Sequence, residues 1–161
     1  MTSVRSDITV ERIVSGGQTG VDQGALDAAL ELGIPCGGWC PAGRRAEDGS
    51  IPDHYPLQET ASRNYNKRTT LNAQDSDATL ILNRGELEGG TAYTLAVVKR
   101  LNRPCLVIDP ESPAACGEIQ GWLKQNNVKV LNVAGPRESK CPGIQRRVCQ
   151  LLAAVFRGSA T

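Results

Sequence analysis

Two uninterrupted apolar runs, at residues 78–82 and 105–108, constrain the fold of this chain more than any other sequence feature. Strands of this composition are typical of parallel sheets, in which both faces are covered and each strand is followed by a crossover. Residues 91–101 lie between the two runs and have a helical pattern, which Asn102 and Pro104 end. The alternation of strand and helix therefore predicts an α/β fold.

The same alternation extends along the whole chain. Further strands are predicted at residues 11–15, 36–40 and 128–133. Further helices are predicted at residues 21–32 and 61–73. Two more helices are predicted, one that starts at Ser112-Pro113 and one that starts at about Pro142. The helix at 61–73 is predicted mainly because a parallel sheet needs a crossover there. The expected architecture is Rossmann-like: a doubly wound, mainly parallel five-stranded sheet with helices on both faces. We expect a single ligand-binding domain over residues 1–161, with residues 1–10 flexible or peripheral.

Charge and composition exclude several partners. The 18 basic and 17 acidic residues give a net charge of +1, too small to attract nucleic acid or an anionic membrane surface. The start is polar, and no run approaches the roughly 18 apolar residues of a membrane span, so we expect a cytoplasmic protein. Homo-oligomers are the expected assembly.

Neither the cysteines nor the histidine indicates a metal site. The six cysteines lie mostly in apolar runs and are expected to be reduced, buried thiols. Cys36 and Cys40 lack the spacing of a structural zinc site, and His54 is the single histidine. No metal ligand is therefore assigned.

The loops that leave the strands differ from those that enter them. Entering loops, such as 33–35 and 102–104, are short and plain, whereas the leaving loops carry most of the glycine and many charged residues. Ligands of open α/β sheets bind at the carboxyl ends of the strands. The candidate binding residues at this edge are Gly16, Gly17, Gln18, Thr19, Gly20, Asp22, Gly43, Arg44, Arg68, Gly89, Gly90, Thr91, Asp109, Arg137 and Ser139.

The chemistry of these residues suits phosphate. Gly16, Gly17 and Gly20 precede a helix, where a backbone without side chains can bring its amides and the helix dipole against an anion. We expect the closest approach at Gly17. Residues 89–91 open a second helix in the same way, and Arg44, Arg68 and Arg137 could pair with phosphate oxygens.

A turn function for these glycines remains open. So does a purely local role for Asp22 in the first turn of its helix, where it could instead orient a ligand or a metal.

Two common nucleotide-binding patterns are absent. Ser15 stands where the dinucleotide fingerprint has its first glycine, and no acidic residue ends the second strand to hold a ribose. The phosphate-loop ending Gly-Lys-Ser/Thr is also missing. We therefore rank a nicotinamide-dependent enzyme below the two other functions considered, a binding protein and a hydrolase.

Five motifs together resemble a known family. They are SGGQTGVDQGALD at 15–27, GGWCPAGR at 37–44, SDATLI at 76–81, GGT at 89–91 and NVAGPRES at 132–139. They resemble the putative molybdenum carrier family, a branch of the Rossmann-like SLOG superfamily that also includes lysine-decarboxylase-like proteins and nucleoside monophosphate phosphoribohydrolases. The resemblance implies a carrier or sensor of a phosphate-bearing small molecule, such as molybdenum cofactor (molybdopterin) or a nucleotide.

The alternative is a hydrolase like the phosphoribohydrolases. Those enzymes have a longer glycine string and a glutamate in the helix after it, whereas here Ala92, Tyr93 and Thr94 follow the loop and no glutamate occurs through residue 102. Glu86 and Glu88 precede the loop and could substitute. We expect a binding protein and assign no catalytic residue.

Overall fold

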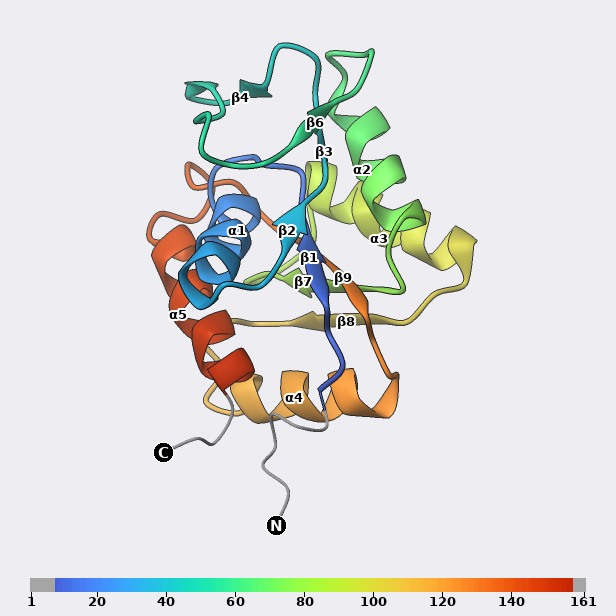
Figure 1. Cartoon of the computed structure of the whole chain (residues 1–161), viewed down its shortest axis with the longest axis vertical. Helices are drawn as coiled ribbons and strands as arrows, with labels where there is room; N and C mark the ends of the chain where they lie inside the picture. Colours follow the sequence, from blue (N-terminus) through green and yellow to red (C-terminus); the bar gives the residue numbers. More distant parts are fainter. Residues whose placement is uncertain (1–7, 158–161) are drawn as a thin grey trace.

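A five-stranded, all-parallel sheet forms the centre of the molecule, with the strand order β2-β1-β9-β7-β8 (Figure 1). The computed structural model describes residues 8–157. Its strands in this sheet are β1 (Arg12–Val14), β2 (Cys36–Gly37), β7 (Ala78–Leu82), β8 (Cys105–Ile108) and β9 (Val130–Ala134). The helices are α1 (Val21–Leu32), α2 (Tyr65–Gln74), α3 (Gly89–Leu101), α4 (Ala115–Gln125) and α5 (Ile144–Arg157). The predicted Rossmann-like class is confirmed.

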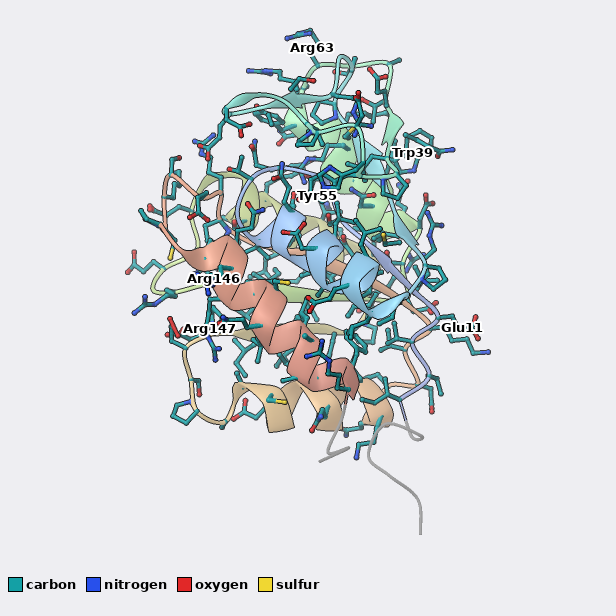
Figure 2. All side chains as sticks on the ribbon, turned by 60° about the vertical axis from the view of Figure 1, so that its left-hand side comes forward. Glu11, Trp39, Tyr55, Arg63, Arg146 and Arg147 are labelled. Atoms are coloured by element: carbon teal, nitrogen blue, oxygen red, sulfur yellow. The ribbon has the colours of Figure 1, made fainter. Side chains whose placement is uncertain are left out.

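Helices cover both faces of the sheet. On one face, α1, α4 and α5 pack over Leu80, Leu82 and Val133, and α1 and α5 lie side by side (Figure 2). On the other face α2 and α3 pack together around Ala73, Val97 and Val98. Successive residues of a strand point to opposite faces, so the continuous apolar run of β7 serves both layers.

Local capping explains where the helices begin and end. Gly33 adopts a left-handed conformation (φ 72°) and ends α1, and Asn102 (φ 59°) ends α3 in the same way. The helix predicted from residue 61 begins at Tyr65, because the side chain of Asn64 accepts a hydrogen bond from the amide of Asn66. The Ser112-Pro113 start belongs to a turn, and α4 begins only at Ala115.

The strand predicted at residues 36–40 is broken at Gly38. Gly38 has φ +130°, and a Cβ there would lie 2.3 Å from the carbonyl oxygen of Ser15. The chain therefore leaves the main sheet after β2, and β3 (Trp39–Cys40) instead pairs in parallel with β6 (Gln58–Glu59). Between them, β4 (Arg45–Ala46) and β5 (Gly49–Ser50) form a small hairpin. We call residues 39–59 the excursion.

The excursion has a small core of its own. Cys40, Ala46, Ile51 and Tyr55 are buried together against Leu26 of α1. The hydroxyl of Tyr55 also donates a 2.5 Å hydrogen bond to Asp27, another α1 residue. The excursion is thus packed against α1.

Two expectations about strands and cysteines need correction. Strand β8 lies at the edge of the sheet, and Val107 is 43% exposed, so this strand is not covered on both faces. All six cysteines are free, but Cys40 alone is fully buried and the other five are half-buried. None of the described helices has the length and apolar composition needed to cross a membrane.

Candidate functional site

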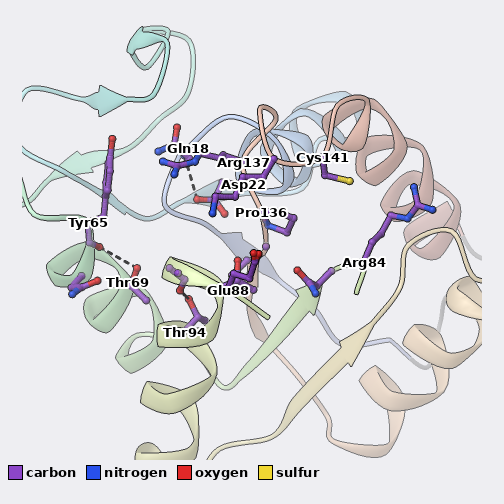
Figure 3. A pocket seen from close by; sticks show the side chains of 18 of the residues that line it. Gln18, Asp22, Tyr65, Thr69, Arg84, Glu88, Thr94, Pro136, Arg137 and Cys141 are labelled. Atoms are coloured by element: carbon purple, nitrogen blue, oxygen red, sulfur yellow. Dashed lines mark hydrogen bonds between the residues drawn. The ribbon is translucent and has the colours of Figure 1, made fainter. Parts of the chain in front are cut away.

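A cleft of about 640 Å³ opens at the carboxyl ends of the central strands. The loops after β1, β7 and β9 and the first turns of α2 and α3 line it. Tyr65 and Thr69 of α2 lie on one side, and Arg84 and Cys141 lie on the opposite side (Figure 3). This volume is in the range of sites for small molecules and cofactors, roughly 300–1,000 Å³.

The topology explains why a cleft forms here. Strands β7 and β9 are neighbours, but β7 leads to α3 on one face of the sheet and β9 leads to α5 on the other. The two connecting loops therefore diverge and leave a crevice between them. Such switch points are the usual ligand sites of open α/β sheets.

The start of α1, the first predicted phosphate site, has its amides occupied by the protein itself. The amide of Gln18 donates to the carboxylate of Asp22 (3.2 Å), and that of Thr19 donates to the side chain of Gln18 (3.0 Å). The amide of Gly20 donates to Gln145 (3.2 Å), and that of Val21 to the carbonyl of Pro136 (3.1 Å). The amides of this loop were expected to be free for an anion, but the four from Gln18 to Val21 are hydrogen-bonded within the protein.

The glycines of this loop are required by packing. A Cβ on Gly16 would overlap the guanidinium of Arg68, and one on Gly17 would lie 2.4 Å from Leu57 in the small core of the excursion. Gly20 has φ +84°, and its Cβ would lie 2.4 Å from the carbonyl oxygen of Pro136. Gly17, where the closest ligand approach was expected, thus faces Leu57 and Ile51 instead of the cleft.

A buried ion pair lies at the wall of the cleft. Arg68 and Asp22 are 3.2 Å apart, and their side chains are 14% and 3% exposed. Burial raises the pKa of Asp22, although the charge of Arg68 and the amides of Gln18 and Gly16 lower it. Among the described residues, the buried Nε of Arg68 has no hydrogen-bond partner. The pair fixes a guanidinium beside the ligand space.

The start of α3, the second predicted phosphate site, is open. No described heavy atom lies within 4 Å of the Cβ positions of Gly89 and Gly90, and no described side chain caps the helix at Glu88. The amide of Thr91 donates to the carbonyl of Glu88 (3.1 Å), whereas the amides of Gly89 and Gly90 have no acceptor among the described residues, and the helix dipole makes this end positive. Gly89, Gly90 and Thr91 line the cleft together with Arg84 and Arg137. An anion can be bound here by backbone amides and guanidinium groups.

The sequence matches the model of the circularly permutated YpsA SLOG family over residues 13–156. The chain belongs to this family. Among solved structures it is similar to the crystal structure titled "Putative molybdenum carrier protein" from Syntrophus aciditrophicus, with 44% identity and a TM-score of 0.89. That match covers 92% of this chain and 96% of the other. No curated protein matches the sequence.

The SLOG cleft includes about half of the residues predicted for the site. Those that line it are Gln18, Asp22, Arg68, Gly89, Gly90, Thr91 and Arg137. Those outside its lining are Gly16, Gly17, Thr19, Gly20, Gly43, Arg44, Asp109 and Ser139. The structure thus brings together residues from the loops after β1, β7 and β9. Of the predicted glycines, only Gly89 and Gly90 line the cleft.

Three of the outlying residues have clear structural contacts. Arg44, a predicted phosphate ligand, donates to the carbonyls of Pro52 (2.7 Å) and Tyr55 (2.9 Å) and so organises the excursion. The amide of Gly43 donates to Glu59 (2.6 Å). Asp109 accepts from the amide of Glu111 (2.8 Å) and lies 3.9 Å from Arg84.

The other fifteen lining residues were not among the predicted binding residues, although Glu86 and Glu88 had been considered as possible carboxylates of a hydrolase. They are Asn64, Tyr65, Asn66, Thr69, Asn83, Arg84, Gly85, Glu86, Glu88, Thr94, Ala134, Gly135, Pro136, Lys140 and Cys141. Asn83 and Arg84 directly follow β7, so the same edge rule could have identified them. Asn64, Tyr65, Asn66 and Thr69 carry no such signal, because α2 follows no strand of the main sheet directly and reaches the cleft through its packing on α3 and β3.

A further unpredicted residue, Glu47, lies behind the cleft lining. Its carboxylate accepts hydrogen bonds from the hydroxyls of Thr19 and Ser139 and from the amide of Ser139 (3.1 Å). Desolvation acts to raise the pKa of Glu47, but these bonds and the charge of Arg137 outweigh it, and the pKa is lowered. Its partners are 28 and 92 residues away in the sequence, so no local pattern marks it.

Proposed function

We propose that this SLOG protein binds a phosphate-bearing small molecule, with the phosphate at the start of α3 and the remainder of the ligand along the cleft. The observation that carries the proposal is the open first turn of α3, with unfilled space at Gly89 and Gly90. Arg84 and Arg137 line the same space and would supply charge-assisted hydrogen bonds. A carrier or sensor needs such a binding site and no catalytic group.

Molybdenum cofactor and nucleotides are the two ligand classes that we propose. Both join a phosphate to a planar heterocycle with hydrogen-bonding edges. The polar side chains of Asn64, Asn66 and Thr69 line the wall formed by α2 and could meet such an edge. No group of three or more His, Cys, Asp or Glu side chains within residues 8–157 is arranged to hold a metal ion. Any molybdenum would therefore be held through the pterin and its phosphate.

Native mass spectrometry of protein purified under mild conditions tests the ligand class. A pterin mass supports the molybdenum cofactor, and a nucleotide mass supports the other class.

Calorimetry with adenosine monophosphate and inorganic phosphate tests the site. Arg84→Gln should weaken binding by at least about tenfold, since hydrogen bonds to charged groups contribute about 1.5–3 kcal/mol. The matched control is Arg157→Gln on α5, whose arginine pairs with Glu31 outside the cleft lining. Absence of any bound mass and of any binding heat would refute the proposal.

One observation favours a hydrolase as a second candidate. Glu86 and Glu88, which precede the glycines in sequence, line the same cleft as Gly89, Gly90 and Thr91. A carboxylate beside a bound nucleoside monophosphate could assist departure of the base, and general acid/base help contributes about a hundredfold to ten-thousandfold. The test is chromatographic detection of free base from adenosine, guanosine and cytidine monophosphates. Fast release that falls sharply in Glu86→Gln or Glu88→Gln would replace the carrier proposal.

A further inference from the structure

The tip of the β4–β5 hairpin places a carboxylate among donors that suit an anionic ligand. Glu47 accepts from the hydroxyls of Thr19 and Ser139, from the amide of Ser139, and lies 3.6 Å from Nε of Arg137. Every one of these donors belongs to the loops after β1 and β9. The excursion contributes the carboxylate that accepts from them. Two hydroxyls, an amide and a guanidinium would serve a phosphate equally well.

This donor group is continuous with the cleft. Arg137 and Gln18 both line the cleft, and both contact Glu47, because the side chain of Gln18 accepts from the amide of Glu47 (2.9 Å). A phosphate bound by Arg137 would place a second negative charge beside the carboxylate of Glu47. Glu47 and the ligand then compete directly.

The base of the hairpin is held by contacts that do not involve Glu47. Ala46 and Ile51 on either side are buried in the small core of the excursion, and Arg44 is bonded to the carbonyls of Pro52 and Tyr55. Gly49 has no described heavy atom within 4 Å of its Cβ position and is exposed. The side chain of Glu47 can therefore be replaced without disturbing the base of the hairpin.

We propose that Glu47 is a built-in competitor of the ligand phosphate for the guanidinium of Arg137. This inference rests on the proposed function, since it concerns the regulation of the same cleft.

Calorimetry on the full chain with adenosine monophosphate tests the competition. Glu47→Gln keeps the size of the side chain but removes its charge, and should bind about tenfold more tightly than wild type. Glu31→Gln removes a carboxylate from the exposed pair with Arg157 and should leave the affinity unchanged. Thermal melts of both variants check that the fold is retained. An equal or weaker affinity in Glu47→Gln, with wild-type binding intact, would overturn the inference and leave the proposed function standing.

If neither protein binds the nucleotide or phosphate in calorimetry, the proposed function itself fails, and this inference with it.

Discussion

The two glycine-rich loops of this protein look alike in sequence and differ in structure. Gly16, Gly17 and Gly20 precede α1, and Gly89 and Gly90 begin α3, both at the carboxyl edge of the sheet. At the first loop every amide from Gln18 to Val21 has an acceptor within the protein. At the second, no described atom fills the space beside the glycines.

The difference shows that glycine before a helix has two separate uses. At α1 the missing side chains let Arg68, Leu57 and the chain at Pro136 approach closely, and the positive end of the helix is neutralised by Asp22. At α3 the missing side chains leave room for something from outside. Variants of the two loops should therefore lose different properties.

The largest effect is expected from Arg68→Met. Removal of one partner from a buried ion pair costs about 3–5 kcal/mol, because the other charge is left without compensation. Burial already raises the pKa of Asp22, and without Arg68 it should rise further. Between its unfolded value near 3.9 and the raised folded value, the folded state binds more protons, so stability falls as the pH rises. Urea unfolding should thus show a large loss at pH 8 and a smaller one at pH 5.

The double variant Arg68→Met with Asp22→Asn is the control for this prediction. It lacks the titrating carboxyl, so its stability should change less between pH 5 and pH 8 than that of the single variant. An equal pH dependence in both would show that Asp22 is not the titrating group.

Gly20→Ala should destabilise the fold by about 3 kcal/mol. At φ 84° and ψ −128° the backbone of Gly20 is in a region open almost only to glycine, and the new Cβ would meet the backbone of Pro136 and Glu138. Gly33→Ala is the control that measures backbone strain without steric overlap. Gly33 has φ +72°, but a Cβ there would meet no described atom within 4 Å. Its cost should be about 1–2 kcal/mol, measured by the same unfolding experiment.

Gly90→Ala should do the reverse: it should keep the fold and weaken the ligand. The added methyl meets no described atom, and alanine in place of a helical glycine stabilises by up to about 0.5–1 kcal/mol. It would occupy the ligand space, and an affinity for adenosine monophosphate lower by about tenfold corresponds to about 1.4 kcal/mol. Gly121→Ala in the exposed part of α4 is the matched control, with the same gain in stability and no change in affinity. Unchanged binding in both variants would place the ligand elsewhere.

The smallest effect concerns the thiols. Burial raises the pKa of Cys105 and of Cys149 to about 11, so only about 0.1% of each is thiolate at pH 8 and both should alkylate slowly. Cys141 lines the cleft, and bound adenosine monophosphate should slow its alkylation a few-fold. Mass spectrometry of labelled peptides measures all three sites in one sample. Protection of Cys105 instead of Cys141 would contradict the placement of the ligand.

The sequence by itself determined the layers of this protein and the edge at which its cleft lies. The apolar side chains of β7 are removed from water only when helices cover both faces of the sheet. Parallel strands place all their carboxyl ends at the same edge. These are properties of strand composition and chain direction, so no long-range contact had to be known. The same rule located Gly89, Gly90, Thr91 and Arg137 at the cleft.

Tertiary structure alone decided which loop is open and which is filled. Gln18 and Gly20 find their acceptors on Asp22 and Gln145, and Gln145 is 125 residues away from Gly20. Glu47 reaches Ser139 from a hairpin that no periodic pattern marks, and Arg44 turns its guanidinium to neighbouring carbonyls. A sequence pattern specifies the groups that a backbone can offer. Whether those groups meet the protein or an outside ligand depends on which distant segments pack against them, and only the folded chain determines that packing.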